Sequence, residues 1–181
     1  MFLGAALFFT ISVEQFKRGL NISSDEINFS SGQKVTVVKI IDGDEISVKL
    51  ASAQFIVRIF GISSFEPEVN DPVMENISKE SFRYLEKTIL NNDVELVFEK
   101  FQKDKEKRVL SYVYYKGIDV GLDMIANGYS IVYTRYIFPR MDEYLKAEKK
   151  SIETRKGLWG QPTAAKRSMQ LKKLWDTERS K

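Results

Sequence analysis

The chain has 181 residues, of which 43% are hydrophobic and 29% are charged, and its formal net charge at pH 7 is +3. This composition is typical of one globular domain with a substantial core, and the small positive charge permits nucleic-acid binding without demanding it. The sequence contains neither cysteine nor histidine, which excludes disulfides, zinc–thiolate sites, thiol catalysis and imidazole bases. Any catalysis must therefore use carboxylates, arginine, lysine, tyrosine or a bound metal.

The first 13 residues, MFLGAALFFTISV, carry no charged side chain. As a helix they would cover about 20 Å, which is less than the roughly 30 Å hydrocarbon core of a membrane. Residues 1–20 can therefore be the core of a signal peptide, a short anchor with Lys17 and Arg18 at the interface, or a packing helix. We expect residues 1–13 to direct export or membrane association, rather than a cytoplasmic location, and residues 21–34 to form a linker.

Three strands are expected where the domain begins. They are the β-branched run KVTVVKII at residues 34–41, the alternating run EISVKL at 45–50, and FIVRIFGI at 55–62. The turns DGD and ASAQ between them are short, so the three strands form an antiparallel meander.

A helix and two more strands follow. Apolar residues at helical spacing predict a helix over residues 74–90. Alternating runs predict strands at 93–101 and 108–115, separated by the charged turn QKDKEK. Five strands interrupted by one helix indicate a small closed barrel.

The C-terminal third of the chain is expected to be helical. A short helix over residues 120–128 ends at Gly128, which is a helix stop signal, and a longer charged helix covers 140–159. The tail from residue 164 to 181 is basic and helical, and it is either a solvated helix or a docking surface for a protein partner. Its apolar residues are Met169, Leu171, Leu174 and Trp175.

Residues 35–162 resemble the staphylococcal nuclease (thermonuclease) family. The resemblance rests on IDGDEISV, on an arginine and a glutamate eight residues apart in RIFGISSFE, on DKEKRVLSYVY, and on ANG followed by KGLWG. It implies a five-stranded OB-fold-like barrel with about three packed helices. The apolar helix of residues 1–20 precedes this domain, and the basic tail of residues 163–181 follows it.

The resemblance also implies catalytic roles for three residues. Arg58, Glu66 and Arg108 lie at the family's catalytic positions. Two planar guanidinium groups suit the negative charge that develops on phosphoryl oxygens, and a nearby carboxylate can orient or deprotonate the attacking water.

Further positions match a calcium site and a nucleotide-binding site. Asp44 lies at a calcium-ligating aspartate, and Ser63 and Ser64 lie at neighbouring ligand positions. Lys105 and Tyr136 correspond to positions near the bound nucleotide.

Two departures from the family pattern concern the loop before Glu66. Ser63 replaces a second calcium-ligating aspartate, and the loss of a carboxylate weakens the binding of a hard cation. Phe65 replaces a proline, which removes a fixed φ angle and leaves Glu66 less constrained.

Two functions from different classes follow. The first is a calcium-dependent nuclease that hydrolyses DNA or RNA. The alternative is a catalytically impaired module of the same fold, acting as a binding or structural subunit of a membrane-associated complex. A third option, nucleic-acid binding without cleavage, is weaker because the aromatic residues of the strands alternate as core residues do.

Overall fold

The computed structural model describes residues 29–66, 71–100 and 103–180. The predicted helix of residues 1–20 and the first part of the linker lie outside the described residues. The strands are β1 (Gln33–Ile40), β2 (Glu45–Leu50), β3 (Ala53–Ile59), β4 (Ile62–Ser63), β5 (Asp93–Val97), β6 (Val109–Tyr115), β7 (Ile118–Asp119) and β8 (Ile131–Val132). The helices are α2 (Pro72–Ile89), α3 (Val120–Asn127), α4 (Met141–Glu153), the 3-10 helix η2 (Gly157–Gly160) and α5 (Pro162–Arg179).

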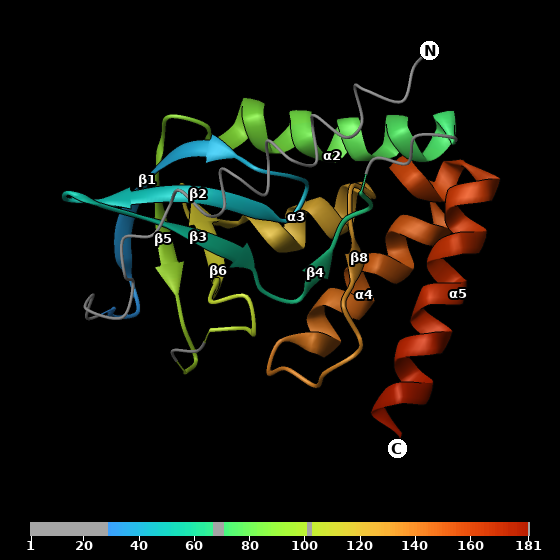
Figure 1. The fold of residues 1–181 in the computed structure, drawn as a ribbon. Coiled ribbons are helices and arrows are strands. Elements are labelled where there is room, and N and C mark those ends of the chain that lie inside the picture. Colours follow the sequence, from blue (N-terminus) through green and yellow to red (C-terminus); the bar gives the residue numbers. More distant parts are fainter. Residues whose placement is uncertain (1–28, 67–70, 101–102, 181) are drawn as a thin grey trace, which may run out of the picture.

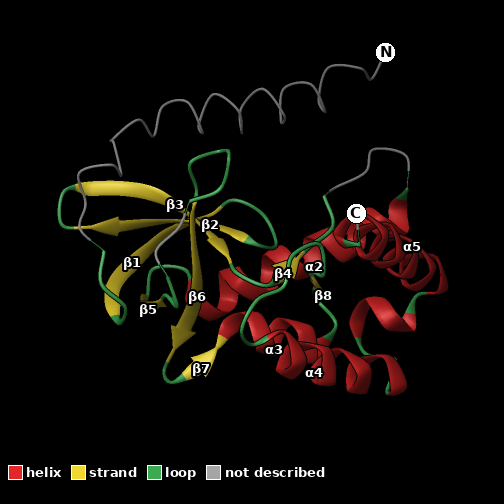
Figure 2. Cartoon of the chain, turned by 90° about the horizontal axis from the view of Figure 1, so that it is seen from below, coloured by secondary structure: helices red, strands yellow, loops and turns green. Residues whose placement is uncertain are grey.

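Five strands close into a barrel, which confirms the predicted OB-like fold. Strands β1, β2 and β3 form the expected antiparallel meander, and β5 and β6 extend the sheet in the order β3-β2-β1-β5-β6. A parallel pairing between β3 and β6 closes it, with Arg58 opposite Leu110. The five barrel strands lie on one side of the molecule, and α4 and α5 gather on the other (Figures 1 and 2).

The predicted strand boundaries are wrong at two places. Strand β3 ends at Ile59 instead of continuing to residue 62, because Gly61 has a φ of +83° and turns the chain into the separate strand β4. Strand β5 ends at Val97 instead of residue 101.

The predicted helix of residues 140–159 is also wrong, because it is two elements. Helix α4 ends at Glu153, and positive φ values follow at Arg155 and at Gly157, the first residue of η2. A Cβ at Gly157 would lie 2.4 Å from the Gly128 carbonyl oxygen, so glycine is needed where these two segments meet. The helices predicted at residues 74–90, 120–128 and 164–181 are confirmed, including the stop of α3 at Gly128 with a φ of 72°.

The buried apolar residues form two clusters. The larger one fills the barrel and extends to α2, α3 and α4. The smaller one, called the second core here, joins α2, β8, η2 and α5, and it includes Phe65, Met74, Trp159 and Trp175. The predicted tail helix is therefore part of the folded domain, although Met169 and Leu174 on its outer side remain 47% and 53% exposed.

Candidate nuclease site

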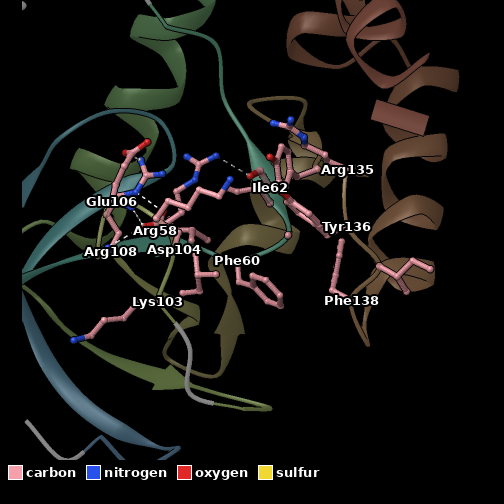
Figure 3. Close-up of a pocket in the computed structure, with 16 residues that line it drawn as sticks. Arg58, Phe60, Ile62, Lys103, Asp104, Glu106, Arg108, Arg135, Tyr136 and Phe138 are labelled. Atoms are coloured by element: carbon pink, nitrogen blue, oxygen red, sulfur yellow. Dashed lines mark hydrogen bonds and ion pairs between the residues drawn. The ribbon is translucent and has the colours of Figure 1, made fainter. Parts of the chain in front are cut away.

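An open pocket of about 570 Å³ lies between the barrel and the segment that follows β8. One wall, called the barrel wall here, comes from the end of β3 and from the turn and start of β6. The other, called the loop wall, is residues 133–138 (Figure 3). Of the predicted site residues, Arg58, Lys105, Arg108 and Tyr136 line this one pocket.

Arg58 stands near the end of β3, directly opposite Glu45 in the β2–β3 pairing. Its guanidinium forms an ion pair with Asp44 and a longer contact of 3.5 Å to the Ile62 carbonyl oxygen. Burial lowers the pKa of Arg58 below its ordinary value, and the nearby Asp42 carboxylate acts in the opposite direction. The side chain is 18% exposed, so it reaches the pocket from a position that is largely shielded from water.

Arg108 is held by a tight turn in front of β6. The Asp104 carboxylate accepts hydrogen bonds from the backbone N–H groups of Glu106 and Arg108, at 2.9 and 3.0 Å, and from Arg108 Nε at 2.6 Å. The same guanidinium pairs with Glu45 and lies 3.0 Å from a Glu106 oxygen. Burial lowers the pKa of Arg108, with Asp42 again opposing the shift.

Behind the two arginines lies an acidic cluster. One carboxylate oxygen from each of Asp42, Asp44 and Glu45 lies within 4.8 Å of the others. An all-oxygen set with three carboxylates has the chemistry that a hard cation such as Ca²⁺ prefers. Much of this set already accepts from protein donors, however, since Asp44 binds Arg58 and Glu45 binds Arg108. A cation here would therefore compete with the arginines for carboxylate oxygens.

The two serines at predicted ligand positions differ in their surroundings. The Ser64 N–H donates to Asp44 Oδ2 at 2.6 Å, and its hydroxyl contacts the Gly43 carbonyl and Ser130. Ser64 is thus joined to the acidic cluster directly. Ser63 belongs to β4 and pairs with Ile131 of β8.

Glu66 is exposed at the end of a described segment and is not among the residues that line the pocket. Phe65 before it is 9% exposed and belongs to the second core. Burial of this side chain holds the chain one residue from Glu66, so the aromatic ring supplies a constraint where the resemblance implies a proline.

The structure adds pocket residues that the sequence analysis did not single out. Tyr133, Arg135 and Phe138 belong to the loop wall, and Lys103 lies on the opposite side. The run YTRYIF around Tyr136, with three aromatic residues and one arginine, is the signal from which the loop-wall residues could have been found. No helix in the described part of the chain combines the length and apolar composition needed to cross a bilayer.

The strand aromatics pack as predicted. Phe55 and Tyr112 are 4% and 2% exposed, while Phe60, Tyr114 and Tyr115 are partly buried against the barrel core.

Comparison with known proteins gives relatives over most of the chain. It is 32% identical over 131 residues to an uncharacterized protein of Bacillus anthracis, covering 70% of this chain and 60% of that protein. It is 29% identical to a probable endonuclease of Leptosphaeria maculans, covering 65% of this chain and 42% of that protein. It is 25% identical to the thermonuclease of Staphylococcus hyicus, covering 60% of this chain and 64% of that protein. The chain thus spans less than two thirds of the length of each of these three relatives.

A family model described as staphylococcal nuclease homologue matches residues 56–161. The match begins within β3 and covers the helix α2, both later barrel strands and the loop wall, and it ends one residue before α5 begins. The closed barrel, the pocket with its two arginines and this match agree, and the chain belongs to the staphylococcal nuclease family.

Proposed function

We propose that this protein is a calcium-dependent nuclease that hydrolyses phosphodiester bonds of DNA or RNA. One observation carries the proposal. Arg58, near the end of β3, and Arg108, in the turn before β6, line a single open pocket together with Lys105 and Tyr136. The relatives named as a probable endonuclease and a thermonuclease support the same reaction class.

The two arginines would bind the phosphate and stabilise its transition state. A guanidinium carries five N–H donors, so it can hold a carboxylate and a phosphate oxygen together. The carboxylate partners of Arg58 and Arg108 fix the direction of each fork before substrate arrives, which lowers the reorganisation needed during reaction.

Glu66 would orient or deprotonate the attacking water, because a carboxylate is already deprotonated near neutral pH, whereas lysine and tyrosine are not, and the chain has no histidine. Lys105 and Tyr136 would contact the nucleotide from the rim of the pocket. A calcium ion held by Asp44, with Asp42, Glu45, Ser63 and Ser64 nearby, would offset negative charge at the phosphate.

The test is cleavage of fluorescent single-stranded DNA and RNA by the full chain, across a calcium titration and in excess chelator. We expect calcium-dependent cleavage that falls by about 10²- to 10³-fold in Arg58→Lys, Arg108→Lys and Glu66→Gln. Arg83→Lys on the exposed side of α2 is the matched control and should keep full activity. Absence of cleavage at every calcium concentration, or equal activity in all variants, would reject the nuclease.

The same fold can also serve as a catalytically impaired module, and a specific observation favours keeping this alternative. Both guanidinium groups are engaged by carboxylates, and Ser63 stands where a second metal carboxylate is expected. In this case the protein would act as a binding or structural subunit. Oligonucleotide binding without cleavage, unchanged by Glu66→Gln, would favour it over the enzyme.

Export or membrane tethering through residues 1–13 is part of the proposal and is supported by the uncharged sequence alone. Partitioning of the full chain onto phospholipid vesicles, compared with a chain lacking residues 1–20, measures it. Equal partitioning of the two chains would reject the tether.

A further inference from the structure

The loop wall of the pocket is a short segment with little regular structure of its own. It follows β8, which has only two residues, and its exposed fractions reach 61% at Tyr136 and 81% at Ile137. One backbone hydrogen bond, from Tyr133 N to the Gly61 carbonyl at 3.0 Å, ties its start to the barrel. A segment with so few backbone contacts needs side-chain contacts to keep one conformation.

The C-terminal end of α5 supplies such contacts along the first half of the segment. Arg179 donates to the Thr134 carbonyl and is itself oriented by Asp176 at 2.9 Å. Glu178 forms an ion pair with Arg135 at 2.8 Å.

The Trp175 ring meets the Tyr133 ring edge to face, with centroids 4.9 Å apart. Tyr133 in turn lies 6.0 Å from the Tyr136 ring. Three successive loop residues therefore each have a partner on α5, and the predicted nucleotide-contacting tyrosine lies next to the first of them.

A buried ion pair fixes the middle of α5 to the strand that leads into the loop wall. Lys172 pairs with Glu148 of α4, which is 3% exposed. The other Glu148 oxygen accepts from the backbone N–H of Val132 at 2.8 Å, one residue before the loop wall begins. Helix α5 thus holds both the entry to the segment and the segment itself.

A second hollow, at the outer side of the loop wall, is also bordered by α5. It is lined by Arg135, Tyr136 and Ile137 together with Glu178 and Arg179. The loop wall therefore separates the pocket from a surface that α5 partly forms, and the helix is its support on that side (Figure 1).

We propose that α5, which begins just after the residues matched by the family model, is a positioning element for the loop wall, with Arg179 as its principal positioning residue. The inference rests on the proposed function, because the loop wall carries Tyr136 at the nucleotide side of the pocket. Preorganisation of this segment removes an ordering cost when a single strand binds. Loss of the support would therefore weaken substrate binding more than the chemical step.

The first experiment is amide hydrogen exchange of the full chain, and it does not depend on activity. Arg179→Ala should raise the exchange rates of residues 133–138 by about tenfold, since it removes a charge-assisted hydrogen bond from an exposed segment. Lys173→Ala, on the exposed side of the same helix, should leave them unchanged, and Arg179→Lys should recover part of the protection. Unchanged exchange in residues 133–138, or equal acceleration throughout α5 and the second core, would overturn the proposal.

The second experiment separates binding from chemistry. With single-stranded oligothymidylate as substrate, Arg179→Ala should raise KM about tenfold while kcat stays within about twofold. A fall in kcat with unchanged KM would overturn the positioning role. If the wild-type chain cleaves no substrate, the proposed function fails, and the exchange experiment still decides whether α5 orders the loop wall.

Discussion

The two walls of the pocket are stabilised in different ways. On the barrel wall, Arg58 projects from β3 within continuous backbone pairing, and Arg108 lies directly before the first residue of β6. Each arginine is tied to a buried acid of β2 or the residue before it. On the loop wall, Tyr136 is held by a short segment whose partners are side chains of α5.

The two walls thus meet two different requirements of the proposed phosphodiester site. The charges that face the phosphate must keep a fixed geometry, and a closed barrel with paired carboxylates provides it. The surface that contacts the nucleotide can be built on a loop, provided that another element restrains the loop. We therefore expect substitutions to separate into those that affect the loop wall and those that affect the barrel wall.

The largest effect on stability should come from the loop-wall support. Lys172→Met leaves the buried Glu148 carboxylate without its cation and should lower the free energy of unfolding by about 3 kcal/mol. Urea unfolding followed by tryptophan fluorescence measures this, since Trp159 and Trp175 both lie in the second core. The neighbouring exposed Lys173→Met is the control and should change little, and equal loss in both variants would contradict the assignment.

The next effect concerns Gly61, where the two walls meet. Gly61→Ala forces a side chain onto a φ of +83° and places its Cβ 2.9 Å from Phe138 Cε2, so we expect a loss of about 2 kcal/mol. Gly117→Ala has a similar φ of +78° but nothing within 4 Å, and it should cost only the backbone part, about 1 kcal/mol. Thermal unfolding of both variants measures the difference, and equal losses would show that the contact with Phe138 is unimportant.

A smaller effect is expected on calcium affinity, and it concerns the barrel wall alone. Ser63→Asp adds a carboxylate where the resemblance implies a calcium ligand, and it should tighten calcium binding at the proposed site by about tenfold. Isothermal titration calorimetry with calcium measures this, with Ser63→Asn as the neutral control of similar size. Equal affinity in the two variants would place the cation away from residue 63.

The smallest effect is a pH dependence of the barrel core. Burial raises the pKa of Tyr112 to about 12, so above pH 10 the unfolded chain loses this proton more readily than the folded chain. The stability linked to Tyr112 is therefore present below pH 10 and lost as the pH rises towards 12. Tyr112→Phe should reduce the fall in unfolding free energy over this range by about 1 kcal/mol, as measured by urea unfolding at several pH values. An unchanged slope would show that Tyr112 does not titrate in this range.

Local patterns were sufficient for much of this fold. Alternation in KVTVVKII and EISVKL, with the DGD turn between them, predicted the first hairpin because strand periodicity and short turns act over a few residues. The stop of α3 at Gly128 was predicted for the same reason. The break inside residues 140–159 was missed because charged, helix-favouring residues continue through Arg155, whereas the close approach of Gly157 to Gly128 determines where the helix ends.

The sequence by itself determined the first three-stranded meander, the five barrel strands and the residue types of the site, because these follow from periodicity, turn residues and family motifs along the chain. The tertiary structure decided which acid faces which arginine, as with Glu45 and Arg108, which lie 63 residues apart. It also decided that Phe65 is buried in the second core and that α5 supports the loop wall. These contacts depend on barrel closure through β3 and β6 and on the docking of a helix from the end of the chain, and no local pattern specifies either one.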